Sequence, residues 1–536
     1  MKPIHTNRVL CILSFAFILT GTIPAAIPDP VHLDSGSVSG NPADDAGVRS
    51  FKGIPFAAPP LADLRWRAPQ PAAHWDGVRK AEQFSSNCTT GGGAGRGGGK
   101  GKGPAGDKGG GGDKGPAPAK AAAPAGPAPS EDCLYVNVWT PAKAAGDRLP
   151  VMVWTYGGGF TGGSGAEGRY DGEAMAKKGI VVVTYNYRLG IFGFLAHPDL
   201  TKESGHNASG NYGMMDQAAV LRWVQKNIAA FGGDPRKVTI AGESAGAIMV
   251  SSMVGSPEGK GLFQRAIGQS GAWMGLSIAK MRTLEQAEEA GKRSVGTHTI
   301  AELRAMSTQE VAQNAPGVQA GLIVDGWLIP EDQSLTFMKG KQNDVDLLVG
   351  SNQDEGTFFG GPPATADAAK TRARQTYVDL ADDFLKLYPA NTDAEAVASG
   401  LMRSRDETGW HQRTWAQLTV KRGKKAYLYY FTHVPPGNGA RGATHTAELP
   451  YMFNNPPTND SWQVGDHKLA DMMSSYWVNF IATGDPNGKG LPQWQAYNAK
   501  NDGQAMVFGD TVQFGPQIEA PRLAFFDKYY AVVMKK

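Results

Sequence analysis

One stretch decides the fold: residues 238–247, which read VTIAGESAGA. A β-branched run ends at a glycine, one serine follows between small residues, and an apolar segment that suits a helix begins at Ala247. The pattern predicts a strand, a sharp turn and a helix, with the hydroxyl of Ser244 exposed at a strained turn. Gly242 and Gly246 would keep larger side chains out of the tight backbone. Gly-x-Ser-x-Gly alone is a weak pattern, but the flanking strand and helix favour a nucleophile over a structural turn.

Strand-like and helix-like segments alternate on both sides of this turn. The pattern predicts strands at residues 134–139, 151–155, 180–185, 238–241, 265–268, 345–350 and 425–433, with a last strand at 506–508. It predicts helices at residues 172–178, 211–230, 281–291, 300–315, 365–388, 410–421 and 468–483. The alternation is typical of the α/β class, in which a mostly parallel, twisted sheet carries helices on both faces. The helical blocks after about residue 275 are expected to cap one edge of the sheet, and residues 31–38 and 47–54 to pair as an N-terminal hairpin.

The first 26 residues have the features of a secretory signal peptide. Lys2, His5 and Arg8 precede an apolar run at residues 9–19, and the small residues of TIPAA at 22–26 suit a signal peptidase. An uncleaved anchor is the alternative, but the run is too short to span a membrane comfortably, and no other stretch is long and apolar enough. We therefore expect a secreted or periplasmic protein. Residues 27–536, which remain after removal of the signal peptide, are expected to form a single domain.

Residues 90–130 differ from the rest of the chain in composition. They are almost all Gly, Ala, Lys and Pro, without an aromatic residue, so they cannot bury enough apolar surface to fold and are expected to form a disordered insertion. Residues 91–130 hold six Lys or Arg and two Asp, whereas the net charge of the whole chain is only +3. The remaining body is close to neutral and gives no support to a nucleic-acid groove. Binding of an anionic surface by the insertion is the alternative to a spare, solvated segment.

The predicted export also determines which cysteines remain in the mature protein and whether they are expected to be oxidised. Removal of the signal peptide removes Cys11 and leaves Cys88 and Cys133 on either side of the insertion. An even pair in an exported protein predicts a disulfide, with two free buried thiols as the alternative.

Ser244 needs a base to take its proton and an acid to orient that base. In a sheet of this type both lie on loops after strands, in the chain order Ser, acid, His. The strand at 345–350 leads to Asp354 and Glu355, and the pattern leaves the choice between these acids open. Glu243, beside the serine, could tune such a site or be a buried structural acid.

Four histidines follow the acids. His411 and His467 lie on helical patterns, whereas His433 ends a strand and His445 lies in the next loop. Both His433 and His445 have suitable positions, and the pattern favours His445 only modestly.

A serine that attacks a carbonyl group also needs nearby backbone N–H groups, which stabilise the charge that develops on the carbonyl oxygen in the transition state. The triplet at residues 157–159, Gly-Gly-Gly, follows a buried strand and lets a substrate approach the backbone. The N–H of Ala245, directly after the serine, would complete this oxyanion hole.

Several segments together resemble the type B carboxylesterases, the α/β-hydrolase family that also includes the cholinesterases. The matching segments are FKGIPFA at 51–57, EDCLYVNV at 131–138, YGGGF at 156–160, NYRLG at 186–190, FGGDP at 231–235, GESAG at 242–246, NQDEGTFF at 352–359 and HTAELPYMF at 445–453. They cover nearly all of the chain after the signal peptide, in the family's order. The resemblance implies an α/β-hydrolase fold and an ester-hydrolysing enzyme.

The resemblance also implies roles for residues that the pattern left open. Glu355 would be the acid and His445 the base, since they occupy the family's Asp-Glu-Gly and His-x-Ala-Glu-Leu-Pro runs. Gly158 and Gly159 would provide the oxyanion donors beside Ala245. The family's first disulfide matches the pair Cys88–Cys133.

One departure from the family pattern argues against one class of substrate. In cholinesterases the loop between these two cysteines supplies the aromatic side chain that stacks on choline. Here that loop is the insertion, which has no Phe, Tyr or Trp, so a choline ester is disfavoured. The insertion is instead a candidate neighbour of the pocket mouth.

The sequence therefore predicts an exported serine esterase that acts on small-molecule esters through Ser244, His445 and Glu355. The mechanism needs no cofactor, and no metal signature such as His-Glu-x-x-His is present. The alternatives are a non-catalytic recognition or adhesion protein on the same fold, a surface-binding protein that uses the basic insertion, and a hydrolase of amides or polyesters. Acyl and alcohol preference and oligomeric state stay open.

Overall fold

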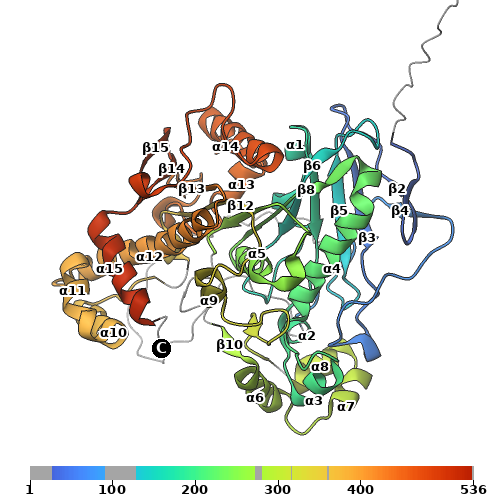
Figure 1. The fold of residues 1–536 in the computed structure, drawn as a ribbon, viewed down its shortest axis with the longest axis horizontal. Coiled ribbons are helices and arrows are strands. Elements are labelled where there is room, and N and C mark those ends of the chain that lie inside the picture. Colours follow the sequence, from blue (N-terminus) through green and yellow to red (C-terminus); the bar gives the residue numbers. More distant parts are fainter. Residues whose placement is uncertain (1–26, 91–127, 272–280, 316, 359–360, 534–536) are drawn as a thin grey trace, which may run out of the picture.

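The computed structural model describes residues 27–90, 128–271, 281–315, 317–358 and 361–533 (Figure 1). The predicted signal peptide lies outside the described residues, as do residues 91–127 of the predicted insertion. In the described part of the chain, no helix combines the length and the apolar character that are needed to span a membrane.

A ten-stranded sheet forms the centre of the protein, and it is mostly parallel, as predicted. In sheet order its strands are β15 (Val512–Pro516), β14 (Gln504–Phe508), β13 (Ala426–Phe431), β12 (Asp346–Asn352), β9 (Arg265–Gln269), β8 (Gly233–Glu243), β6 (Leu149–Thr155), β7 (Val181–Tyr185), β5 (Tyr135–Thr140) and β3 (Arg49–Pro55). The strands from β14 to β7 run parallel, and β15, β5 and β3 pair antiparallel at the two sides. The carboxyl ends of the parallel strands therefore meet along one edge.

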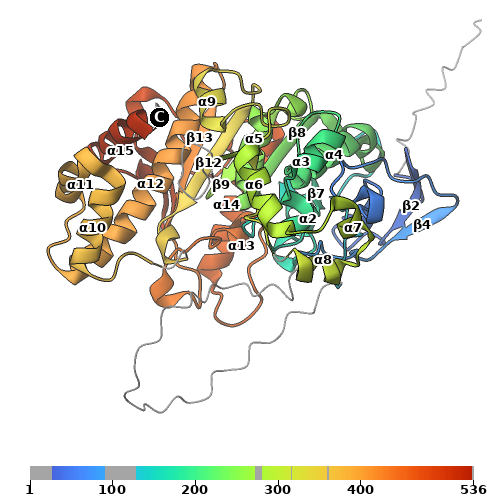
Figure 2. The ribbon, with the colours of Figure 1, turned by 90° about the horizontal axis from the view of Figure 1, so that it is seen from below.

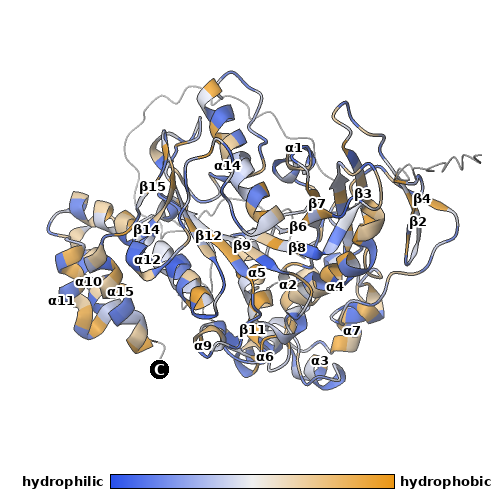
Figure 3. Cartoon of the chain, turned by 45° about the horizontal axis from the view of Figure 1, so that its top comes forward, coloured by the Kyte–Doolittle hydropathy of each residue, from blue (hydrophilic) through white to orange (hydrophobic). Residues whose placement is uncertain are grey.

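Helices cover both faces of this sheet. Trp154 of β6 packs edge-on against Phe453, whereas the next residue, Thr155, accepts a hydrogen bond from the amide of Gln217 on the other face. Figures 1 and 2 show the helices on either side of the strands, and Figure 3 shows apolar residues gathered along the central strands. The apolar runs at 151–155 and 181–185 are buried, as the sequence predicted.

The described helices have the following bounds: α1 (Glu173–Ala176), α2 (Gly190–Phe194), α3 (Pro198–Glu203), α4 (Tyr212–Asn227), α5 (Ala245–Gly255), α6 (Leu284–Val295), α7 (Ile300–Ala305), α8 (Thr308–Asn314), α9 (Gln333–Met338), α10 (Ala366–Tyr377), α11 (Ala381–Leu387), α12 (Asp393–Lys421), α13 (Leu449–Met452), α14 (Val464–Thr483) and α15 (Ala520–Val533). Short strands outside the central sheet are β1 (Val31–Leu33), β2 (Gly36–Gly40), β4 (Val78–Ala81), β10 (Arg282–Thr283) and β11 (Ile323–Val324). Helices α10, α11 and α15 gather at one end of the molecule, beyond β14 and β15 (Figure 1).

The predicted N-terminal hairpin is wrong. The turn lies inside the first segment, between β1 and β2, which pair antiparallel from Val31↔Val38 to Leu33↔Gly36. The second segment forms β3, which pairs with β5 at the side of the central sheet. Alternating apolar residues show that a segment is a strand but not which strand it joins.

Helix boundaries also differ from the prediction. The helix predicted at 300–315 is split into α7 and α8 because Ser307 caps a new helix and forms a capping box with Glu310. The helix predicted at 365–388 is likewise interrupted, by a short turn at Val378–Leu380. The helix predicted at 410–421 starts earlier, at residue 393, and 506–508 is not the last strand, since β15 follows.

The predicted disulfide between Cys88 and Cys133 is present. The double variant Cys88→Ser/Cys133→Ser should lower the free energy of unfolding by about 4 kcal/mol, because the bond closes a loop with a sequence separation of 45 residues. Denaturant titration measures the difference. Wild type that has been reduced and alkylated is the control and should match the double variant. A denaturation midpoint equal to that of the oxidised wild type would contradict the expectation.

Candidate active site

The turn at Ser244 has the predicted form. Strand β8 ends at Glu243 and helix α5 starts at Ala245, with Ser244 between them at φ 56° and ψ −125°. A positive φ is strained for a serine and is kept only where the surroundings require it. The N–H of Ser244 donates to the carbonyl oxygen of Gln269 at 2.9 Å, which ties the turn to the end of the next strand, β9. The side chain is half-buried.

Close packing explains the glycine on the helix side of this turn. A Cβ on Gly246 would lie 2.0 Å from the carbonyl oxygen of Thr155, which ends β6. Helix α5 can approach β6 this closely only without a side chain there.

The glycine triplet lies directly against the serine. A Cβ on Gly157 would be 2.9 Å from the Cβ of Ser244, so this glycine brings the loop close to the turn. Gly158 and Gly159 have φ of 103° and 63° and are exposed. Among the described residues, neither of their N–H groups donates a hydrogen bond. The N–H of Ala245, in the first turn of α5, has no acceptor within its own helix.

His445 and Glu355 are brought together from different strand ends. Glu355 begins the short 3₁₀ turn (Glu355–Thr357) after β12, and His445 lies in the loop between β13 and α13. Nδ1 of His445 lies 2.6 Å from Oε2 of Glu355, and both side chains are buried. The other oxygen of Glu355 accepts a hydrogen bond from the N–H of Asn352 at 3.0 Å. The carboxylate is therefore held in one orientation towards the imidazole.

The alternative acid and base have other partners. The carboxylate of Asp354 accepts a hydrogen bond from the N–H of Ala443 at 2.8 Å. His433 lies between Asp466 and Asp510, at 2.9 and 3.2 Å. Of the pairs that the sequence left open, the structure joins Glu355 with His445.

The two helical histidines lie elsewhere. His411 is buried on α12, where its Nε2 lies 3.2 Å from the hydroxyl oxygen of Tyr530, and His467 is exposed on α14.

A second carboxyl group faces the same imidazole. Oε1 of Glu243 lies 3.1 Å from Nε2 of His445, and the Glu243 side chain is almost fully buried. Burial raises the pKa of Glu243 to about 8. Burial by itself would lower the pKa of His445, but the charges of Glu243 and Glu355 outweigh it and raise that pKa to about 9. Glu243 is therefore part of the electrostatics of the site.

A third buried acid, Glu448, was missed by the sequence reasoning. Its carboxylate accepts hydrogen bonds from the side-chain amides of Gln269 at 2.9 Å and Asn352 at 2.6 Å. Burial raises its pKa, and the two amides oppose that rise. Its place three residues after His445, in the same HTAELPYMF run, was the one available signal.

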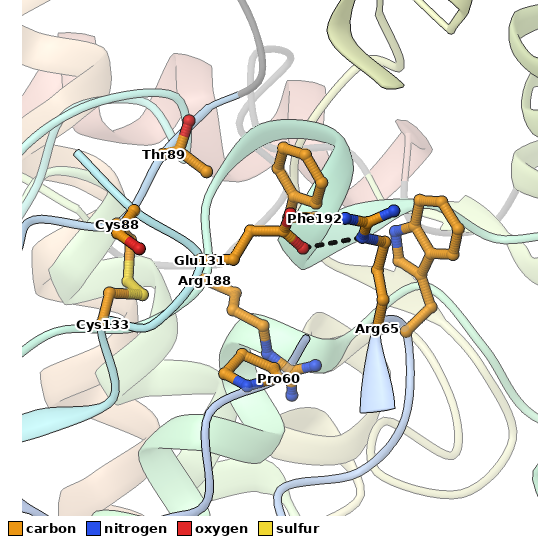
Figure 4. Close-up of a pocket in the computed structure, with 10 residues that line it drawn as sticks. Pro60, Arg65, Cys88, Thr89, Glu131, Cys133, Arg188 and Phe192 are labelled. Atoms are coloured by element: carbon orange, nitrogen blue, oxygen red, sulfur yellow. Dashed lines mark hydrogen bonds and ion pairs between the residues drawn. A yellow bond between two sulfur atoms is a disulfide. The ribbon is translucent and has the colours of Figure 1, made fainter. Parts of the chain in front are cut away.

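The small cavity beside the disulfide is not this site. It has a volume of about 10 Å³ and is lined by residues that include Arg65, Glu131 and Arg188 (Figure 4). Arg65 and Glu131 form a buried, two-pronged ion pair there, with N–O distances of 2.6 and 2.7 Å. The space is sufficient for about one water molecule, so its lining is structural. No cluster of three or more His, Cys, Asp or Glu side chains that could hold a metal ion occurs among the residues that the structure describes.

Comparison with known proteins places the chain in a family. The sequence model of the carboxylesterase family matches residues 28–526. The chain belongs to the carboxylesterase family. This carboxylesterase is 37% identical over 547 residues to the fumonisin B1 esterase of Sphingopyxis macrogoltabida, an alignment that covers 96% of this chain and 94% of that protein. It is 30% identical to the para-nitrobenzyl esterase of Bacillus subtilis (strain 168), with 92% and 98% of the two chains covered.

Solved structures agree with this assignment. A PNB esterase superimposes on the carboxylesterase with a TM-score of 0.74 at 29% identity, over 92% of this chain and 99% of that one. The protein is thus an ester-hydrolysing enzyme with an α/β-hydrolase fold, as the resemblance implied.

Proposed function

We propose that this carboxylesterase cleaves small-molecule esters through an acyl-enzyme on Ser244, with His445 as base and Glu355 as the acid that orients it. The observation that carries the proposal is the 2.6 Å contact between Nδ1 of His445 and Oε2 of Glu355. A carboxylate at Nδ1 holds the proton there and leaves Nε2 to accept the proton of a serine.

In the proposed reaction these residues act in two steps. The Ser244 oxygen attacks the ester carbonyl while Nε2 of His445 takes its proton, and Glu355 stabilises the imidazolium that forms. His445 then protonates the leaving alcohol as the carbon–oxygen bond breaks. Water, deprotonated by the same imidazole, attacks the acyl-enzyme, and His445 then gives that proton to the Ser244 oxygen as its bond to the acyl group breaks and the acid leaves.

The N–H groups of Gly158, Gly159 and Ala245 stabilise the oxyanion in both steps. The two glycine N–H groups have no acceptor within the described residues, and the third lies at the N-terminus of α5. Donors that are already oriented cost no reorganisation when charge develops on the oxygen, and each contributes roughly 100-fold or more in rate.

We also propose that the enzyme is exported, as a secreted or periplasmic protein. The charged and apolar pattern of residues 1–26 supports a signal peptide, and the Cys88–Cys133 disulfide suits an oxidising compartment.

Labelling with a fluorophosphonate and an ester panel test the mechanism. The probe should modify Ser244, and the panel should contain p-nitrophenyl esters of increasing chain length, an anilide and a polyester. Fumonisin B1 belongs in the panel because the name of the 37% identical relative gives it as that protein's ester. Modification of another residue, or no ester turnover by the wild type, would overturn the proposal, and the latter would favour a recognition protein.

In Glu243→Gln, the pH at which kcat/KM reaches half of its maximum should fall by about 1–2 units. The substitution removes a negative charge 3.1 Å from the imidazole, which destabilises the imidazolium and lowers the pKa of His445. The neutral base is then available at lower pH. A pH profile between about 5 and 10 measures the midpoint. Glu289→Gln, which alters an exposed carboxylate paired with Lys292 on α6, is the control and should leave the midpoint in place. A midpoint that stays fixed or rises in Glu243→Gln would contradict this electrostatic role.

A further inference from the structure

The carboxylate of Glu448 lies between two side-chain amides at adjacent strand ends. Nε2 of Gln269, the last residue of β9, donates to one oxygen at 2.9 Å, and Nδ2 of Asn352, the last residue of β12, donates to the other at 2.6 Å. All three side chains are fully buried. Strands β9 and β12 are neighbours in the sheet, so the three side chains form a bridge across one strand gap.

The backbones of the same two amide residues hold parts of the proposed catalytic site. The carbonyl of Gln269 accepts the N–H of Ser244 at 2.9 Å, and the N–H of Asn352 donates to Glu355 at 3.0 Å. The Asn352 amide also donates to the carbonyl of Thr444 at 3.0 Å, in the peptide that precedes His445. The bridge therefore connects the segments that carry the nucleophile, the acid and the base.

Further contacts fix which way the amides point. The indole N–H of Trp477, on α14, donates to Oε1 of Gln269 at 3.0 Å, so the NH₂ group must face Glu448. Both N–H bonds of the Asn352 amide are used, one by Glu448 and one by Thr444. The orientation of both amides is thus defined, since an exchange of N and O in either amide would break a buried hydrogen bond.

We propose that Gln269 and Asn352 are positioning residues, whose amides clamp Glu448 and so keep Ser244, Glu355 and His445 in register. This inference rests on the proposed function of those three residues. A shift of about 1 Å in any of them costs on the order of 100-fold in rate, so the clamp acts on turnover more than on substrate binding.

A swap of hydrogen-bond polarity tests the clamp. Gln269→Glu sets a second carboxylate against Glu448, and we expect kcat to fall about 10–100-fold with KM within about 3-fold of wild type. In Gln269→Glu/Glu448→Gln, the new amide at 448 donates to residue 269 and still accepts from Asn352, while Trp477 keeps its acceptor. The double variant should therefore recover kcat to within about 5-fold of wild type, and its pH profile should have the wild-type midpoint, which the extra carboxylate of Gln269→Glu raises.

Two further variants separate the possible outcomes. Asn352→Asp removes both donors of that amide and should lower kcat in the same way, so the clamp can be tested even where Gln269→Glu fails to fold. Gln353→Glu, next in the chain, is the matched control and should keep kcat within about 3-fold, since its contact is an acceptor oxygen facing Tyr430.

Failure of the inference differs from failure of the proposed function. Wild-type kcat and pH profile in both Gln269→Glu and Asn352→Asp, alongside an inactive Ser244→Ala, would overturn the clamp and leave the mechanism standing. A swap variant that folds but regains no activity would also overturn it, because the bonds would be present without effect. Activity retained by Ser244→Ala would instead remove the mechanism on which the clamp rests.

Discussion

Ser244→Ala should lower kcat about 10⁴-fold or more, with little change in the folded structure. The substitution removes the oxygen that would form the acyl-enzyme, and no other group replaces it. The turn keeps its backbone contacts, because the bond from the N–H of residue 244 to Gln269 does not involve the side chain. Steady-state hydrolysis of p-nitrophenyl acetate measures the loss, and the fluorophosphonate probe should no longer label the protein.

Ser251→Ala is the matched control on the same helix. Ser251 is also buried on α5, but its hydroxyl donates to the carbonyl of Ile248, which lies in the same helix. Its kcat should stay within about 3-fold of wild type. If Ser244→Ala retained activity within a few fold of wild type, covalent catalysis by this serine would be excluded.

Glu355→Gln should lower kcat by about 10³–10⁴-fold, because it changes which nitrogen of the imidazole carries the proton. One oxygen of Glu355 accepts from the N–H of Asn352, and the other faces Nδ1 of His445. A glutamine must keep its oxygen towards Asn352, so its NH₂ group faces Nδ1. Nδ1 then has to accept, the proton moves to Nε2, and Nε2 can no longer take the proton of Ser244.

Asp354→Asn is the matched control, one residue away. Its side-chain oxygen can still accept the N–H of Ala443, so kcat should stay within about 3-fold. Fluorophosphonate labelling rates of both variants report on the serine independently of deacylation. A large loss in Asp354→Asn with an active Glu355→Gln would reverse the assignment of the acid.

Local pattern was sufficient for the turn and for the buried strands. The run at 181–185 and the glycines around Ser244 restrict their own backbone, so their sequences carry the information. Local pattern could not distinguish Glu355 from Asp354 as the acid, because the two carboxyl side chains are neighbours on one loop. Resemblance to the family preferred Glu355, and the structure shows why the two differ: one faces His445 and the other Ala443.

Local sequence could not predict that Gln269 and Asn352 bind Glu448. Gln269 and Glu448 are 179 residues apart, and Asn352 and Glu448 are 96 apart. An amide at a strand end has no periodicity, and its role depends on which side chains the fold brings to it. The pairing of β3 with β5 was missed for the same reason, since strand partners are chosen by long-range packing.

The Cys88–Cys133 disulfide also holds the two ends of the segment between these cysteines next to each other. The Cα atoms of Cys88 and Cys133 are 5.0 Å apart. Beside them the N–H of Thr89 donates to the carbonyl of Ser130 at 3.0 Å, and the N–H of Ser130 donates to the carbonyl of Asn87 at 2.8 Å. The entropy of closing a loop rises only with the logarithm of its length, by about 0.6 kcal/mol for each doubling. The stretch between Thr89 and Ser130 is therefore a suitable graft site, because an insert with adjacent termini, such as a reporter peptide or a small binding domain, leaves these anchoring contacts in place.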